Sequence, residues 1–169
     1  MAWPFRRRSG AIVSLAALLC SACLYGFAGG GFAPHLKTVA ILPFDNLTPD
    51  PALTREVSEA VRDALESRLG LRVAAEATAD ALVRGRVVRY EPGIALAVQA
   101  GDGSFRVNRR QVQITVDVEL VDQKEGRTVW QRQSLSVIGE YEEGREADGR
   151  KIALQKLTNE IVDGAQSQW

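Results

Sequence analysis

The chain has 169 residues, of which 46% are hydrophobic, and its 21 basic and 21 acidic residues give a formal net charge of zero. This balance does not support nucleic-acid binding, which usually comes with an excess of basic residues. The only two cysteines lie close together near the N-terminus. We therefore expect no disulfide framework, and a hydrophobic core must stabilise the fold.

Residues 1–22 have the layout of a secretory signal peptide. Three arginines at positions 6–8 precede a short apolar run over residues 11–19, and the small residues Ser21 and Ala22 follow. The apolar run is shorter than the roughly 20 residues that a membrane-spanning helix needs. We therefore predict that residues 1–22 are removed.

The residues around Cys23 resemble a bacterial lipobox, in which the cysteine becomes the acylated N-terminus. Ser21 and Ala22 supply the two small residues, and Cys20 stands where a leucine is usual, as a small hydrophobic residue. We predict that Cys23 carries the covalent lipid, including palmitate, which holds the chain on a membrane surface. Cys20 would leave with the signal peptide.

Residues 23–36 predict a flexible spacer, and Leu24 indicates in which membrane the protein is anchored. Residues 23–36 include three consecutive glycines, at positions 29–31, and predict a flexible tether. Leu24 follows the lipidated cysteine where an aspartate often directs retention in the inner membrane, so we expect the outer membrane. The 147 residues that remain after removal of residues 1–22 carry 18 basic and 21 acidic side chains, a net charge of −3. This length predicts a single domain over residues 37–169.

The domain is predicted to begin with a buried strand over residues 37–46 and then a helix. Asp50 is a suitable N-cap, Pro51 a suitable first helical residue, and Gly70 a suitable C-terminal stop. Between them, apolar residues recur at helical spacing, with charged residues on the opposite side.

A strand-rich region is predicted next, with strands at 71–75, 79–92, 111–121 and 128–141 and a hairpin turn at 122–127. Gly85 is expected to mark a β-bulge, and residues 111–121 alternate strictly between apolar and polar. A second helix is predicted over residues 145–166, with Ile152, Leu154, Leu157, Ile161 and Ala165 toward the core. The order strand, helix, strands, helix predicts an α+β fold, in which a mixed or antiparallel sheet packs two helices on one face.

Residue patterns typical of catalysis are missing from the sequence. No metalloprotease, nucleophile-elbow, P-loop or dinucleotide-binding spacing occurs. The single histidine, His35, lies in the segment that leads into the domain and is interpreted as a polar surface residue. We therefore expect no catalytic residues, no metal site and no cofactor apart from the lipid on Cys23.

Arginines are the residues with the clearest binding potential. Arg106, Arg109 and Arg110 fall in a predicted loop over residues 101–110, and the preceding strand carries arginines at 84, 86 and 89. If the strands pair, these side chains could form one site for phosphate groups, because guanidinium binds two oxygens at once. An ordinary solvated hairpin is the alternative.

The alternation of residues 94, 96 and 98 and then of residues 111–121 indicates a β-hairpin. We expect this hairpin to lie in the sheet of the domain. The alternative is that it lines an oligomeric membrane barrel.

The mature sequence resembles the LPS-assembly lipoprotein LptE family. The similarity includes an aromatic residue soon after the lipidated cysteine, a strand that ends in Phe-x-Asn, and a leucine-bearing amphipathic helix after one or two prolines. The matching residues are Tyr25, Pro34, Leu36, Val39, Phe44, Asn46, Thr48, Pro49, Pro51 and Leu53. The start Cys23-Leu24-Tyr25 departs slightly from the family's usual Cys-Gly-Tyr.

The resemblance implies a non-enzymatic protein at the periplasmic face of the outer membrane. Such proteins sit inside the β-barrel LptD, help it to assemble and help deliver lipopolysaccharide to the outer leaflet. Composition alone suggests that Arg106, Arg109 and Arg110 contact lipopolysaccharide phosphates. The alternatives are a lipoprotein activator of a peptidoglycan synthase, a curli-secretion-type pore lipoprotein and a periplasmic enzyme.

Overall fold

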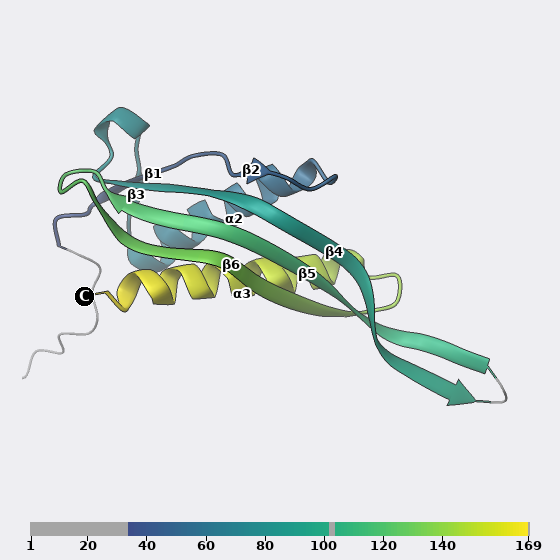
Figure 1. Cartoon of the computed structure of the whole chain (residues 1–169). Helices are drawn as coiled ribbons and strands as arrows, with labels where there is room; N and C mark the ends of the chain where they lie inside the picture. The colour runs from purple at the N-terminus through teal and green to yellow at the C-terminus, as the bar shows by residue number, and fades with distance from the viewer. Residues whose placement is uncertain (1–33, 102–103, 169) are drawn as a thin grey trace, which may run out of the picture.

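The computed structural model describes residues 34–101 and 104–168, and for residues 97–101 and 104–108 it describes the backbone alone. One sheet carries two helices on one face, as predicted (Figure 1). The strands are β1 (Thr38–Ile41), β2 (Asp45–Asn46), β3 (Arg72–Val73), β4 (Ala81–Gly101), β5 (Ser104–Asp122) and β6 (Arg127–Glu142). The helices are α2 (Ala52–Leu69), the short 3-10 helix η2 (Glu76–Thr78) and α3 (Glu146–Gln166).

The sheet is mixed, with the strand order β3-β1-β4-β5-β6, and β2 pairs separately with β4. Strand β1 runs parallel to both β3 and β4, with Val39 opposite Val73 on one side and Ala81 on the other. Strands β4, β5 and β6 form an antiparallel meander. The N-terminal strand is therefore inserted between two segments that follow it in the chain.

Helix α2 follows the predicted local pattern. The Asp50 carboxylate accepts the Ala52 backbone N–H at 3.0 Å, and Pro51 already has helical dihedral angles. Gly70 ends the helix in the left-handed conformation, at φ 66°. The buried side of the helix carries Leu53, Val57, Val61, Ala64 and Leu65.

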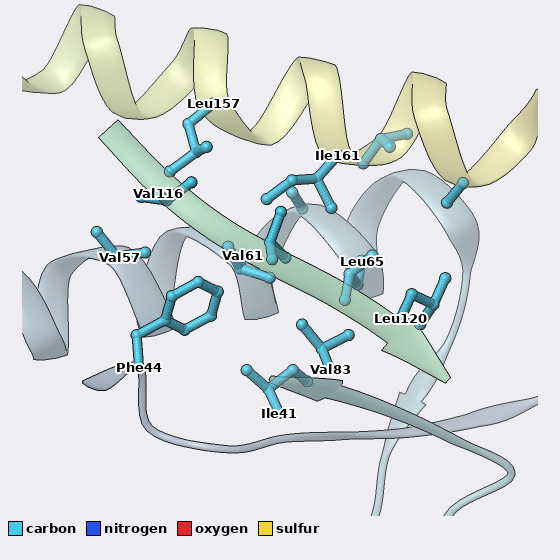
Figure 2. Packing of buried hydrophobic residues seen from close by; sticks show 14 of the residues in the cluster. Ile41, Phe44, Val57, Val61, Leu65, Val83, Val116, Leu120, Leu157 and Ile161 are labelled. Carbon is cyan, nitrogen blue, oxygen red and sulfur yellow. The ribbon is translucent and has the colours of Figure 1, made fainter. Parts of the chain in front are cut away.

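The core lies between the sheet and the two helices, where side chains from all three converge (Figure 2). The predicted alternation of β5 is confirmed, because every second side chain is buried. These side chains are Val112, Ile114, Val116, Val118 and Leu120. Burying aliphatic side chains of this kind contributes roughly 1.5–3 kcal/mol each before entropy is subtracted.

The structure corrects the prediction for residues 37–46. They form the two short strands β1 and β2, because the chain leaves the sheet at Phe44, whose backbone N–H bonds Ser58 Oγ at 3.0 Å. The Phe44 ring packs over Gly85, where an added Cβ would overlap it. Gly85 pairs regularly with Val118, so the expected bulge at Gly85 was wrong, and the register shift nearest to it lies between Val87 and Arg89.

Helix α3 matches the predicted range, but one predicted inward residue was wrong. Ile152 is 38% exposed, and the buried side carries Gly149, Ala153, Leu157, Ile161 and Ala165 among others. The helix lies close against β6 because Gly139 and Gly149 have no side chains at the contact.

The β4–β5 hairpin extends beyond the rest of the sheet (Figure 1). Strand β6 pairs with β5 only as far as Arg109, which lies opposite Glu142. Beyond that point residues 98–101 pair with residues 104–107, and we call this part the β4–β5 arm. The sequence analysis favoured a place in the sheet for this hairpin. The structure agrees, because the hairpin continues the core strands β4 and β5.

Candidate binding surface on the open face of the sheet

The face of the sheet opposite the helices, here called the open face, carries charged pairs between β4 and β5. Arg84 lies opposite Glu119 and bonds it at 2.9 Å, while Arg86 lies opposite Asp117 at 3.2 Å. Opposite charges at directly facing positions stabilise a sheet modestly. At these positions the open face carries charged side chains that already have partners.

The two carboxylates of these pairs are also bonded to β6. Glu119 accepts the Thr128 hydroxyl hydrogen at 2.7 Å, and Asp117 accepts the Ser134 backbone N–H at 2.8 Å. The Thr128 hydrogen bond lowers the pKa of Glu119, and the bond and charge of Arg84 add to this against the opposing effect of burial. Glu119 is consequently held ionised near neutral pH.

A hollow of about 330 Å³ lies over these pairs. Its lining includes Asp45, Arg84, Arg86, Asp117, Glu119 and Arg132. The mixture of charges suits water or a polar protein surface better than an apolar ligand.

Arg109 and Arg110 lie on β5 and not in a loop, so the predicted loop over residues 101–110 was wrong. The prediction failed because pairing with β4 extends the strand through polar residues. Arg109 donates to Glu140, and Arg110 donates to Glu143 at 2.9 Å and to the Gly93 carbonyl at 3.0 Å.

The structure does not bring all the predicted arginines to one face. Consecutive strand residues point to opposite faces, so Arg109 and Arg110 diverge. Arg84, Arg86 and Arg89 have carboxylate partners on the open face. Arg106 pairs through its backbone with Gln99, and its side chain lies outside the described residues.

A family model described as "LptE: Lipopolysaccharide-assembly" matches residues 36–165. The chain belongs to the LptE family. This match covers both helices and nearly every described strand residue, including the open face. LptE-family proteins are accessory lipoproteins without enzymatic activity.

Solved structures resemble the fold of this chain at low sequence identity. Protein XCC0632 from Xanthomonas campestris is 15% identical with a TM-score of 0.53, and the match covers 82% of this chain and 92% of that one. The hypothetical protein CT253 from Chlamydia trachomatis is 15% identical with a TM-score of 0.52, covering 78% and 96%. A comparison with curated protein sequences found no match.

Cys23, residues 1–22 and the glycines at 29–31 lie outside the described residues, so lipidation stays a prediction. Within residues 34–101 and 104–168, neither helix combines the length and apolar character that crossing a membrane requires.

His35 has a more specific environment than the sequence indicated. Its Nε2 lies 2.6 Å from Oδ2 of Asp122, a carboxylate with 0% exposure at the end of β5. Burial alone would raise the pKa of Asp122, but hydrogen bonds from His35 and from the backbone N–H groups of Glu125 and Lys124 lower it overall. No local sequence signal links His35 to Asp122, because 87 residues separate them.

A second carboxylate, Asp80, fastens the same segment. It accepts the backbone N–H groups of Lys37 and Thr38, both at 2.9 Å, and pairs with Lys124 Nζ at 2.7 Å. The Lys124 bond is the largest of the causes that hold the pKa of Asp80 far below its usual range. Residues 34–37, here called the lead segment, are therefore tied to the β5–β6 turn.

Proposed function

We propose that this LptE-family chain is an outer-membrane lipoprotein that partners the β-barrel LptD, assists its assembly and helps deliver lipopolysaccharide to the outer leaflet. The family match over residues 36–165 is the observation that carries the proposal. The lipobox-like sequence before Cys23 supports lipid anchoring on the periplasmic face.

The open face supports a partner with a polar surface. The chain's own helices cover only the opposite face, and the charges of Arg84, Arg86, Asp117 and Glu119 are neutralised in pairs. The interior wall of a large membrane barrel is also polar. A surface of paired charges can meet such a wall without burying an isolated charge, which would be costly.

We also propose that Arg106, Arg109 and Arg110 contact the phosphates of lipopolysaccharide near the base of the β4–β5 arm. The ion pairs of Arg109 with Glu140 and of Arg110 with Glu143 lie at the surface. Exposed ion pairs of this kind contribute only about 0–1 kcal/mol. A phosphate that binds a guanidinium through two oxygens can therefore replace a carboxylate partner.

The first experiment is a detergent pull-down of the tagged full-length chain from its own membranes, with partners identified by mass. We expect recovery of LptD in about one-to-one amount. Recovery of a peptidoglycan synthase, or of a homo-oligomeric ring alone, would contradict the proposal and favour the activator or the pore.

Two charge-reversal variants locate the interface. Arg84→Glu combined with Arg86→Glu changes the open face and should reduce LptD recovery at least tenfold. Arg55→Glu combined with Arg62→Glu changes two exposed residues of α2 and serves as the matched control. Equal recovery from both double variants would remove the open face from the proposal, and circular dichroism would verify that both remain folded.

A further inference from the structure

Three atoms that can bind a metal ion come together where the lead segment meets the β5–β6 turn. They are His35 Nε2, Asp122 Oδ2 and Glu125 Oε1, and all lie within 4.8 Å of one another. His35 comes from the lead segment, Asp122 ends β5, and Glu125 belongs to the turn. The fold, and not a local motif, therefore assembles this group.

Asp122 is oriented as a ligand would need to be. Its Oδ1 accepts the backbone N–H groups of Lys124 at 2.8 Å and Glu125 at 3.0 Å. The side chain is fully buried, so these two bonds hold it in one orientation with Oδ2 directed at His35. Hydrogen bonds of this kind orient the carboxylate ligands of known metal sites.

The acidic side chains around the group each have a basic neighbour. Glu125 is bonded through Oε2 to Arg127, which leaves Oε1 directed at His35 Nε2 at 3.8 Å. Lys124 pairs with Asp80 at 2.7 Å, and its Nζ also donates to the His35 carbonyl oxygen at 3.4 Å. Two carboxylates thus face one imidazole.

We propose that His35, Asp122 and Glu125 bind one divalent transition-metal ion, with Zn²⁺ the best match. Zinc accepts imidazole nitrogen and carboxylate oxygen at about 2.0–2.2 Å, so neighbouring ligand atoms lie about 3.4 Å apart around a tetrahedral ion. The spacings of 2.6 Å and 3.8 Å from His35 Nε2 lie on either side of this value, so His35 and the exposed Glu125 must move slightly for the ion to bind. Water completes the coordination. This differs from the sequence-based expectation of no metal.

Binding replaces the hydrogen bond between His35 and Asp122 with two metal–ligand bonds. His35 must present Nε2 without its proton to the ion, so the hydrogen bond to Asp122 cannot coexist with the metal–ligand bond. The bound ion would clamp the lead segment to the β5–β6 turn more firmly than the hydrogen bond does.

The test uses the full lipidated protein in detergent, purified with a tag free of histidine. His35 is the only histidine of the chain, so the imidazole ¹⁵N spectrum reports this residue alone. We expect the Nε2 resonance to shift on addition of ZnCl₂ and the shift to saturate at one equivalent. The thermal unfolding midpoint should rise by several degrees at the same point.

Two conservative variants test the ligands by calorimetric titration with ZnCl₂. His35→Gln keeps a hydrogen-bond donor for Asp122 but removes the imidazole, and Glu125→Gln removes the charge of an exposed turn residue. Each should weaken Zn²⁺ binding at least tenfold, while Glu143→Gln on a distant exposed carboxylate should leave it unchanged. An Nε2 resonance that stays unshifted at ten equivalents of ZnCl₂, or equal affinity in all four proteins, would overturn the proposal.

Discussion

Gly139 of β6 lies directly against Gly149 of α3, and a Cβ added to Gly139 would overlap the Gly149 carbonyl group. A Cβ added to Gly149 would in turn overlap the Tyr141 ring, and one on Gly164 would overlap Trp130. The absence of these side chains brings the helix close to the strand. Helix position and strand position are therefore coupled through backbone contact.

Gly139→Ala should destabilise the protein by about 1–3 kcal/mol, because the extra methyl group forces α3 away from β6. Urea denaturation monitored by circular dichroism measures the change. Ser136→Ala on the same strand is the control, since Ser136 is exposed, and its loss should cost less than about 0.5 kcal/mol. Equal stability of the Gly139 variant and the wild type would contradict the close contact.

Arg150→Met should destabilise the junction between α2, α3 and β4. Arg150 is largely buried, pairs with Asp50 at 2.8 Å and with Glu56 and Glu146 at 3.4 Å, and lies 4.9 Å from the centre of the Tyr90 ring. Its removal leaves three carboxylates without their shared cation. We expect a loss of roughly 2–3 kcal/mol, below the 3–5 kcal/mol typical of fully buried pairs.

The matched control for Arg150 is Arg145→Met. Arg145 is exposed and pairs with Asp148 on the surface of α3. This change should cost less than about 1 kcal/mol. Chemical denaturation of both variants at pH 7 measures the free energy of unfolding. Equal losses of this free energy in the two variants would show that burial of Arg150 does not increase its contribution to stability.

Stability should fall in acid, below about pH 4. The pKa values of Asp80 and Asp122 are lower in the folded protein than their ordinary value of 3.8. For Asp80 the main cause is the hydrogen bond from Lys124. For Asp122 burial raises the pKa, but the hydrogen bond with His35 and two backbone hydrogen bonds outweigh it. A carboxyl group whose pKa is lower in the folded protein stabilises the fold at pH values above the pKa of the unfolded chain. This stabilisation is lost as the pH falls through the pKa of the folded protein.

The double variant Asp80→Asn with Asp122→Asn tests this pH dependence. It should be less stable at pH 7 and lose less stability between pH 5 and pH 3 than the wild type. Asp148→Asn, on an exposed residue, should follow the wild-type curve. Urea denaturation at pH 7, 5, 4 and 3 measures all three, and parallel acid curves for the double variant and the wild type would refute the assignment.

Reversal of charge at Arg106, Arg109 and Arg110 should weaken lipopolysaccharide binding at least tenfold. The two pairs with Glu140 and Glu143 become repulsive, but both lie at the surface, so the fold should survive. Co-precipitation with labelled lipopolysaccharide measures binding, with Arg55→Glu plus Arg62→Glu as the control. Unchanged binding in the triple variant would remove these arginines as the phosphate site.

Cys23→Ala should abolish incorporation of labelled palmitate and release the protein from the membrane fraction. Cys20→Ala should have neither effect, because Cys20 is predicted to leave with the signal peptide. Palmitate labelling and membrane fractionation of the two variants measure both properties. Loss of label in the Cys20 variant alone would show that Cys20 carries the lipid, which would contradict the assignment to Cys23.

The sequence predicted the elements whose signals are local. Asp50, Pro51 and Gly70 delimit α2, and strict alternation from Val112 to Leu120 identifies the half-buried strand β5. Helical spacing also placed α3 within one residue of its observed start. Each of these features depends on neighbouring residues, so a single sequence is enough to read them.

Features that depend on pairing partners could not be read in this way. Residues 104–110 look like a polar loop and become a strand because β4 supplies the partner. Gly85 is needed for the Phe44 ring, which comes from a segment 41 positions earlier. The acidic partners of Arg109 and Arg110, and the approach of His35 to Asp122, likewise require knowledge of the register.

The lead segment and the tip of the β4–β5 arm lie at opposite ends of the molecule, as Figure 1 shows. Strand β4 has 21 residues, so it spans at most about 70 Å. If the predicted lipid on Cys23 holds the N-terminus at a membrane, the β4–β5 arm lies at the end of the domain far from the anchor. The length of the β4–β5 hairpin would then set how far from the membrane the domain can reach a partner.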